Sequence, residues 1–271
     1  MERVANGTCN IWFESMSDGP PVVMVYGIGN NSRRWWTEFP RLLAGRYRLT
    51  MMDNRGVGYS DRPHEAWTMA DMVADVHAVV EAAGLDTFHL LGCSLGSSVV
   101  RHYALAHGER LRSLSLLCPP NGTPATEADM KLGIMWDPAK PRVESERASW
   151  VVVHPEDWAA AHEAELLADF ERSEAERTPG RTFHHQMQSV AGAGDPNPGL
   201  NAFDWPVLIL HGTADRLVPP KNAETLKAAV PRARLEWLVG ASHTFWQHDP
   251  AGAADAVLRF LDAAEAASGG E

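Results

Sequence analysis

The pentapeptide Gly92-Cys93-Ser94-Leu95-Gly96 constrains this chain more than any other feature. The apolar run Thr87–Leu91 precedes it, and a helix-like run, Ser97–Leu105, follows it. A G-x-S-x-G segment between a strand and a helix is typical of a nucleophile elbow, a sharp turn that lifts a serine hydroxyl off a sheet. Such a turn strains the serine backbone by roughly 1–3 kcal/mol. Its flanking residues must be small, and Gly92 and Gly96 carry no Cβ.

The rest of the chain alternates apolar strand-like runs with helix-like runs. Helices are expected at Met69–Ala83, which Gly84 ends, at Asn222–Ala229 and at Ala251–Ala267. The runs that predict strands are Cys9–Glu14, Val22–Tyr26, Tyr47–Met52, Thr87–Leu91, Leu114–Cys118, Pro206–Leu210 and Leu235–Val239. This alternation predicts an α/β fold with a mostly parallel, twisted sheet and helices on both faces.

The alternation stops at Pro119-Pro120 and resumes from Thr182-Phe183. Residues 121–180 are acidic, poor in strand signal, and contain several Trp and Met residues. Within them, Pro155–Arg177 is predicted to form one helix with an apolar stripe. We therefore expect a core made of residues 1–120 and 181–271, with residues 121–180 as an inserted helical cap.

Composition narrows the functional classes. The 271-residue chain has a formal charge of −11, which argues against nucleic acid or an anionic membrane surface as partner. No apolar run approaches 18 residues, and no signal peptide is apparent. Three cysteines without metal-ligand spacing indicate a reducing, cytoplasmic location and no disulfides. The oligomeric state stays open.

A serine hydroxyl is a weak nucleophile, so Ser94 needs a base that is oriented by an acid. In an elbow-containing fold the acid and then the histidine follow the serine along the chain, each after a later strand. Asp215 follows one predicted strand and His243 follows the last. Singly, each residue could be an ordinary turn or structural residue, but the ordered set predicts a Ser94–His243–Asp215 triad.

The oxyanion formed by attack on a carbonyl needs backbone N–H donors. We expect these from Leu95, directly after the nucleophile, and from Ile28 in the turn Tyr26-Gly27-Ile28-Gly29. A glycine-rich turn could instead bind phosphate, but the chain lacks both G-x-x-x-x-G-K-[ST] and a full G-x-G-x-x-G. The histidines show no metal-binding pattern either. No metal and no cofactor are predicted.

These motifs resemble the α/β-hydrolase superfamily over nearly the whole chain outside residues 121–180. The likeness is strongest to small esterases, lactonases and polyketide methylesterases. The resemblance implies that Asp53–Pro63 forms a turn that buttresses the oxyanion loop, and that Trp35 lines the pocket. Three positions depart from the family pattern: Tyr26 replaces a usual His, Ser242 a usual Gly, and His248 an often acidic residue.

We therefore expect a cofactor-free serine hydrolase that cleaves a small-to-medium carboxylic ester or lactone through an acyl-enzyme on Ser94. Trp35, Met135, Trp136 and Val218 are predicted to line the substrate pocket. The same triad could serve acyl transfer, C–C bond hydrolysis, or a lyase or cyclase reaction. A slow-turnover sensor of small molecules is a further alternative.

Overall fold

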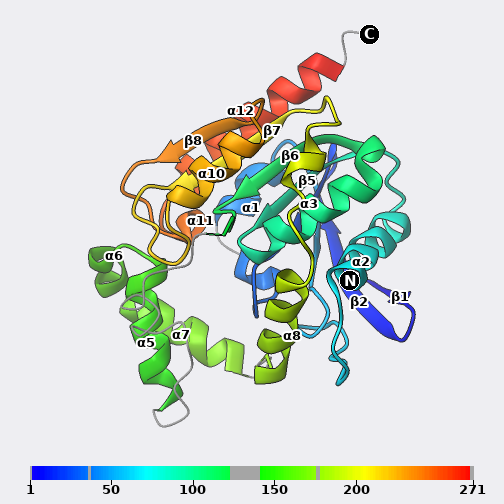
Figure 1. Cartoon of the computed structure of the whole chain (residues 1–271). Coiled ribbons are helices and arrows are strands. Elements are labelled where there is room, and N and C mark those ends of the chain that lie inside the picture. The colour runs from blue at the N-terminus through cyan, green and yellow to red at the C-terminus, as the bar shows by residue number, and fades with distance from the viewer. Residues whose placement is uncertain (1, 36–37, 123–140, 175–177, 269–271) are drawn as a thin grey trace.

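The computed structural model describes residues 2–35, 38–122, 141–174 and 178–268 (Figure 1). One eight-stranded sheet with the order β1-β2-β4-β3-β5-β6-β7-β8 forms its centre. The strands are β1 (Glu2–Asn6), β2 (Cys9–Met16), β3 (Pro21–Val25), β4 (Arg48–Met52), β5 (Phe88–Cys93), β6 (Leu111–Leu117), β7 (Val207–Gly212) and β8 (Arg234–Leu238). The sequence analysis missed only β1, which is polar and exposed along much of its length.

Strands β3 to β8 pair in parallel, whereas β2 pairs antiparallel with both β1 and β4. This is the mostly parallel sheet that the strand–helix alternation predicted. Parallel strands share one carboxyl-terminal edge. The turns that follow β3, β5, β6, β7 and β8 therefore meet at that edge.

Helices cover both faces of the sheet because its central strands are apolar on both sides. In β3, Val23 and Val25 belong to one hydrophobic core, while Val22 and Met24 belong to a second, as expected when side chains alternate across a strand. The first core is closed by α2 (Met69–Ala82), α3 (Leu95–His107) and α10 (Lys221–Ala229). The second is closed by α1 (Glu38–Ala44), α11 (Phe245–His248) and α12 (Pro250–Ser268).

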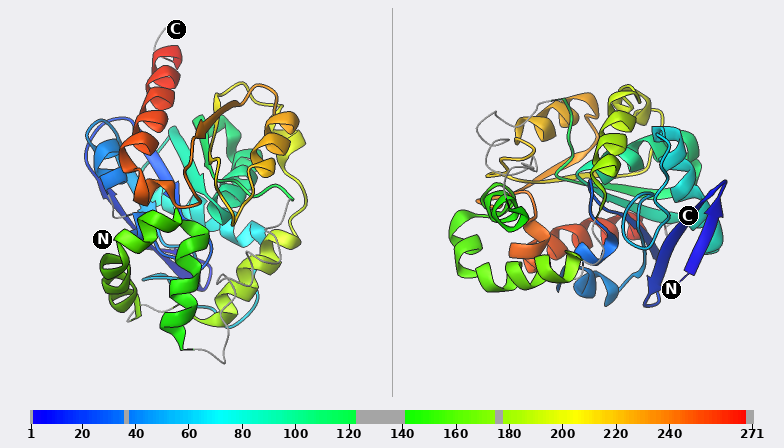
Figure 2. Two further views of the ribbon diagram at one scale, coloured as in Figure 1. Left: turned by 90° about the vertical axis from the view of Figure 1, so that its left-hand side faces the viewer. Right: turned by 90° about the horizontal axis from the view of Figure 1, so that it is seen from below.

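The region between β6 and β7 is helical in its described part. It contains α5 (Arg142–Val153), α6 (Glu156–Ala161), α7 (Glu163–Glu174), α8 (Gly180–Ala191) and α9 (Asn197–Leu200). Figure 1 shows α5, α6 and α7 grouped away from the sheet, with α8 between them and α2. The turned views of Figure 2 show α5 to α7 (green) at one end of the molecule.

Two expectations for this region were wrong. The single helix predicted over residues 155–177 is two helices, α6 and α7, which are separated at His162. The backbone there leaves helical geometry, with φ −112° and ψ 19°. The His162 ring stacks on Trp158 at 4.1 Å between ring centroids, and its Nδ1 bonds to the Trp158 carbonyl, an acceptor that it shares with the His162 backbone N–H. Strand–helix order also resumes later than predicted, because α8 and α9 precede β7.

None of the helices within the described residues is both long enough and apolar enough to cross a membrane.

Candidate active site

Ser94 occupies the sharp turn between β5 and α3. Its backbone has φ 49° and ψ −123°, a sparsely populated conformation for a residue other than glycine. The turn is held in place by the Ser94 N–H, which donates to the Leu117 carbonyl at 2.9 Å. A Cβ on Gly96 would lie 2.2 Å from the Val25 carbonyl oxygen, and a Cβ on Gly92 would lie 2.5 Å from the Gly96 carbonyl oxygen. Both glycines are therefore required by close backbone approach.

Asp215 and His243 are brought together by the turns after β7 and β8. The His243 Nδ1 and the Asp215 Oδ2 are 2.8 Å apart, and both side chains are buried. The other oxygen, Oδ1, accepts backbone N–H bonds from Leu217 and Val218. The carboxylate is therefore fixed by its own loop and aimed at one nitrogen of the imidazole, which leaves Nε2 for chemistry.

A second histidine also reaches this carboxylate. His211 Nε2 lies 2.8 Å from the Val218 carbonyl oxygen and 3.4 Å from Asp215 Oδ2. Burial opposes ionisation of Asp215, but the charge of His243 and the hydrogen bonds from His211 and His243 outweigh it and lower its pKa to about 2. Asp215 is therefore an anion throughout the neutral range.

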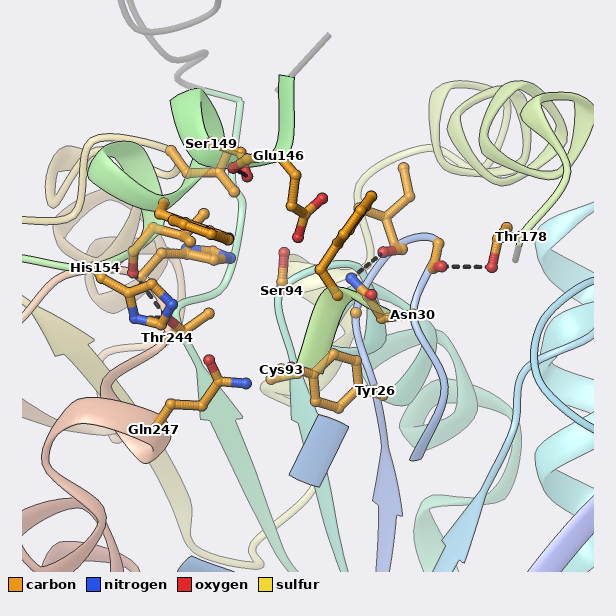
Figure 3. Close-up of a pocket in the computed structure, with 18 of the residues that line it drawn as sticks. Tyr26, Asn30, Cys93, Ser94, Glu146, Ser149, His154, Thr178, Thr244 and Gln247 are labelled. Atoms are coloured by element: carbon orange, nitrogen blue, oxygen red, sulfur yellow. Dashed lines mark hydrogen bonds between the residues drawn. The ribbon is translucent and has the colours of Figure 1, made fainter. Parts of the chain in front are cut away.

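Ser94 and His243 line the same cavity, which has a volume of about 270 Å³ (Figure 3). Among the described contacts, Ser94 Oγ makes no hydrogen bond. The His243 Nε2 instead lies 3.8 Å from the thiol sulfur of Cys118, which directly follows β6. Cys118 also has a positive φ, 41°, so its backbone is strained like that of Ser94.

Cys118, Asp215 and His243 place their donor atoms within 4.8 Å of one another, which is compatible with metal-ligand spacing. Both Asp215 oxygens, however, already accept hydrogen bonds. Burial also raises the pKa of the Cys118 thiol well above its ordinary value, which keeps the sulfur protonated beside His243. These donors fit a hydrogen-bonded chain better than an ion site.

The turn after β3 borders Ser94 directly. A Cβ on Gly27 would lie 3.2 Å from the Ser94 Cβ, and Ile28 lines the cavity. Leu95 is buried and is the first residue of α3, so its N–H lies at a helix start where no intrahelical acceptor exists. The structure thus places both expected oxyanion donors beside the Ser94 turn.

Two distant segments hold the turn after β3 in shape. Asn54 Nδ2 donates to the Tyr26 carbonyl at 3.0 Å, which gives the Asp53–Pro63 turn the buttressing contact implied by the family resemblance. Gly29 N–H donates to Gln186 Oε1 at 2.8 Å, and Thr178 Oγ1 donates to the Gly29 carbonyl at 2.7 Å. The N–H and the carbonyl of Gly29 are therefore held by Gln186 in the middle of α8 and by Thr178 just before this helix.

The structure describes two of the four predicted pocket residues, and neither of them lines the cavity. Trp35 does not line the cavity: it is fully buried in the second core, where its ring lies 4.8 Å from that of Tyr26 and 5.1 Å from that of Trp246. Val218 does not line it either, whereas the neighbouring Leu217 does. Met135 and Trp136 lie outside the described residues.

Most of the remaining wall was missed by the sequence analysis. Helix α5 and its C-cap contribute Arg142, Glu146, Ser149, Trp150, Val153 and His154. Figure 3 shows Glu146 directed from α5 toward Ser94, with Ser149 and His154 on the same side of the cavity. The orientation of an inserted helix cannot be read from the periodicity of its own residues, so the sequence did not identify the polar wall residues Arg142, Glu146, Ser149 and His154.

The His243 loop is also tied to the end of α5. Thr244 Oγ1 donates to the Val153 carbonyl at 2.8 Å and bonds to His154 Nδ1 at 2.8 Å, and the Thr244 N–H donates to the Val153 carbonyl. On its other side, the Ser242 N–H donates to His248 Nε2 at 3.3 Å. Burial lowers the pKa of His248 to about 4, so His248 remains the neutral acceptor that this contact needs.

Known proteins resemble this chain along most of its length. A protein of Variovorax paradoxus, provisionally named carbamate hydrolase RutD, is 29% identical over 231 residues, which cover 84% of this chain and 86% of that protein. A Synechocystis protein, provisionally named a non-heme chloroperoxidase, is 24% identical over 262 residues, with 90% and 92% covered. The crystal structure of the esterase RhEst1 from Rhodococcus sp. ECU1013 matches with a TM-score of 0.83 at 25% identity, covering 97% of this chain and 98% of that chain.

Residues 20–246 match the model of the family described as the alpha/beta hydrolase fold. That span contains the sheet from β3 to β8, the Ser94 turn, Asp215 and His243. The chain therefore belongs to the α/β-hydrolase family and is an enzyme of the hydrolase class.

Proposed function

We propose that this enzyme is a cofactor-free serine hydrolase that cleaves small-to-medium carboxylic esters or lactones through an acyl-enzyme on Ser94. The observation that carries the proposal is the contact of His243 Nδ1 with Asp215 in a cavity that Ser94 shares. A buried aspartate on Nδ1 holds the imidazole in the tautomer whose Nε2 can accept a proton. That is the chemistry that a serine nucleophile needs.

In the first half-reaction Ser94 Oγ attacks the ester carbonyl while His243 Nε2 takes the hydroxyl proton. The tetrahedral intermediate collapses, the bond to the alcohol breaks, and His243 returns the proton to the leaving oxygen. In the second half-reaction a water attacks the acyl-enzyme, with His243 again as base, and the acid is released. Asp215 stays ionised throughout and stabilises the imidazolium, in keeping with its pKa of about 2.

The backbone N–H groups of Leu95 and Ile28 are proposed to stabilise the oxyanion. Their placement on either side of the Ser94 turn supports this role. Because peptide donors that are fixed before the reaction need no reorganisation, they act most strongly in a site that excludes water. Helices α5 to α7 are proposed to serve as the cap that closes the cavity, since Arg142, Trp150 and Phe170 reach into it from α5 and α7.

Active-site labelling tests the nucleophile. A fluorophosphonate is expected to label Ser94, and Ser94→Ala is expected to abolish labelling and to lower kcat for a 4-nitrophenyl ester by roughly 10⁴–10⁶-fold while the protein folds normally. Ser149→Ala is the matched control, because Ser149 lines the same cavity but its hydroxyl donates to the backbone carbonyl of Glu146 at 2.7 Å, and it should label as the wild type does. Labelling of the Ser94→Ala variant, or its retained esterase activity, would show that another residue is the nucleophile.

A further inference from the structure

The cavity above Ser94 contains a carboxylate that the proposed reaction does not use. Glu146 lies on α5, lines the cavity and is half-buried. Figure 3 shows its side chain directed at the Ser94 hydroxyl. No hydrogen bond or ion pair of this carboxylate occurs among the described residues. By contrast, the neighbouring Arg147 forms an ion pair with Glu163 at 2.9 Å.

An unpaired carboxylate that faces a partly enclosed cavity loses hydration without gaining a partner, which raises the free energy of the unliganded state. A cation in the cavity would remove that cost. The rest of the wall also suits a cation, because the aromatic side chains of Trp150 and Phe183 line the same space and aromatic rings attract cations. Carboxylate and aromatic groups together are what an ammonium group needs.

We propose that Glu146 makes this enzyme selective for substrates that carry a positively charged, ammonium-type group close to the scissile carbonyl. The inference rests on the proposed function and names the substrate class for the same site. The opposing feature is Arg142, which also lines the cavity and whose guanidinium carbon lies 5.6 Å from the Phe170 ring centroid. An anionic substrate would be drawn to Arg142 instead. A preference for cationic over anionic substrates would therefore indicate that Glu146 dominates the cavity.

Three aryl esters with tetrahedral end groups of similar size separate charge from shape. They are the 4-nitrophenyl esters of 4-trimethylammoniobutyrate (cationic), 5,5-dimethylhexanoate (its neutral carbon isostere) and 4-sulfobutyrate (anionic). The wild type should cleave the cationic ester with a kcat/KM about 10-fold or more above that of the isostere, and the anionic ester should be the poorest. Added salt should narrow the gap, because screening weakens attraction between charges that remain partly hydrated.

Glu146→Gln should bring the kcat/KM of the cationic ester close to that of its neutral isostere, and this ratio, not the absolute rate with either ester, is the readout. Glu144→Gln is the matched control, since it removes the same charge from the exposed side of α5 and should keep the wild-type ratio. An unchanged cation-to-isostere ratio in Glu146→Gln, or a wild-type preference for the anion, overturns the inference. Ser94-dependent cleavage of the neutral ester would in that case leave the proposed function standing.

Binding separates the inference from catalysis altogether. The anilides of the same three acids, added to the Ser94→Ala protein and followed by calorimetry, report selection without turnover. The cationic anilide should bind about 10-fold more tightly than its isostere, and the additional Glu146→Gln change should equalise the two. Equal binding of all three anilides to Ser94→Ala would count against Glu146 selection even if no ester proved to be a substrate.

Discussion

Asp215 joins two loops that lie 28 residues apart in the chain. One carboxylate oxygen is held by backbone N–H groups of its own loop, and the other faces His243 and, at longer range, His211. An anion in that position does more than fill a turn, because it selects which imidazole nitrogen carries the proton. The charge of Asp215 therefore sets the tautomer of His243, whereas the size and hydrogen bonds of its side chain shape the turn.

Asp215→Asn removes the charge of this side chain and keeps its size. The amide keeps the size of the side chain but cannot hold His243 in the tautomer that leaves Nε2 unprotonated, so kcat should fall by about 10⁴-fold with little loss of stability. Steady-state kinetics and thermal melts measure the two effects. Asp249→Asn, which alters a carboxylate that accepts the Gly252 N–H at the start of α12, should leave kcat nearly unchanged. A loss of less than 10-fold in Asp215→Asn would point to a different acid.

At the residue scale, the sequence predicted the positions of site residues that directly follow a strand. Ser94, Asp215 and His243 each follow a strand of the parallel sheet, and strand position alone determines that they meet at one edge. Cys118 sits at the same edge, directly after β6, and could have been found by the same rule. Glu146 could not, because its place depends on how an inserted helix docks against the sheet.

Among the elements, α5 is hydrogen-bonded to the His243 loop, although about 90 residues separate the two in the chain. Its last residues accept or donate hydrogen bonds to both neighbours of His243: the Val152 carbonyl accepts from Ser242 Oγ at 3.3 Å, and Val153 and His154 bond to Thr244. The helix that forms one wall of the cavity therefore also positions the proposed base.

Thr244→Val tests this coupling. Valine keeps the shape of the side chain but removes the hydroxyl, so the bond to His154 Nδ1 and one of the two bonds to the Val153 carbonyl are lost, at a cost of roughly 1 kcal/mol each. We expect kcat to fall about 10-fold, with a smaller change in KM. Thr225→Val, at an exposed hydroxyl on α10, is the control and should change neither constant. An unaffected kcat in Thr244→Val would mean that the backbone bond of Thr244 alone holds the loop.

The predictions of helices and strands were confirmed where the apolar residues of the sequence are also the buried ones. The six strands β3 to β8 are apolar runs bounded by turns, and all were expected within a few residues of their observed bounds. The helix predicted over residues 155–177 failed because a local contact, the His162 ring on Trp158, outweighed the regular apolar stripe. Short polar elements such as β1 give no periodic signal to detect.

On the scale of the whole molecule, His89 links the sheet to the last helix. It is fully buried in β5, its Nδ1 is hydrogen-bonded to Ser113 on β6 at 2.7 Å, and its Nε2 lies 3.1 Å from Glu265 on α12. Burial lowers the pKa of His89 to about 4, although the Glu265 carboxylate opposes the shift. The folded protein thus resists a protonation that the unfolded chain accepts.

Stability should accordingly fall on acidification. Because the folded pKa lies below the unfolded value of about 6.5, the contribution of His89 is complete above pH 6.5 and is lost as the pH falls toward 4, amounting to at most about 3 kcal/mol. Urea unfolding at pH 7, 5.5 and 4 measures it. His89→Gln should flatten this dependence, whereas His64→Gln, at an exposed site, should not. Parallel curves for the wild type and His89→Gln would rule out this origin.

The hydrogen bonds to Gly29 join the turn after β3 to the segment around α8. Thr178 bonds to the carbonyl of Gly29 and Gln186 to its N–H, so the two peptide units that flank Gly29 are held from 149 and 157 residues further along the chain. An exchange of residues 121–180 between relatives would carry Thr178 with the new segment and leave Gln186 with the host. The two residues that bond to Gly29 would then come from different parent proteins. Residues 27–29 and 178–186 therefore form one unit of inheritance, although no continuous stretch of the gene encodes it.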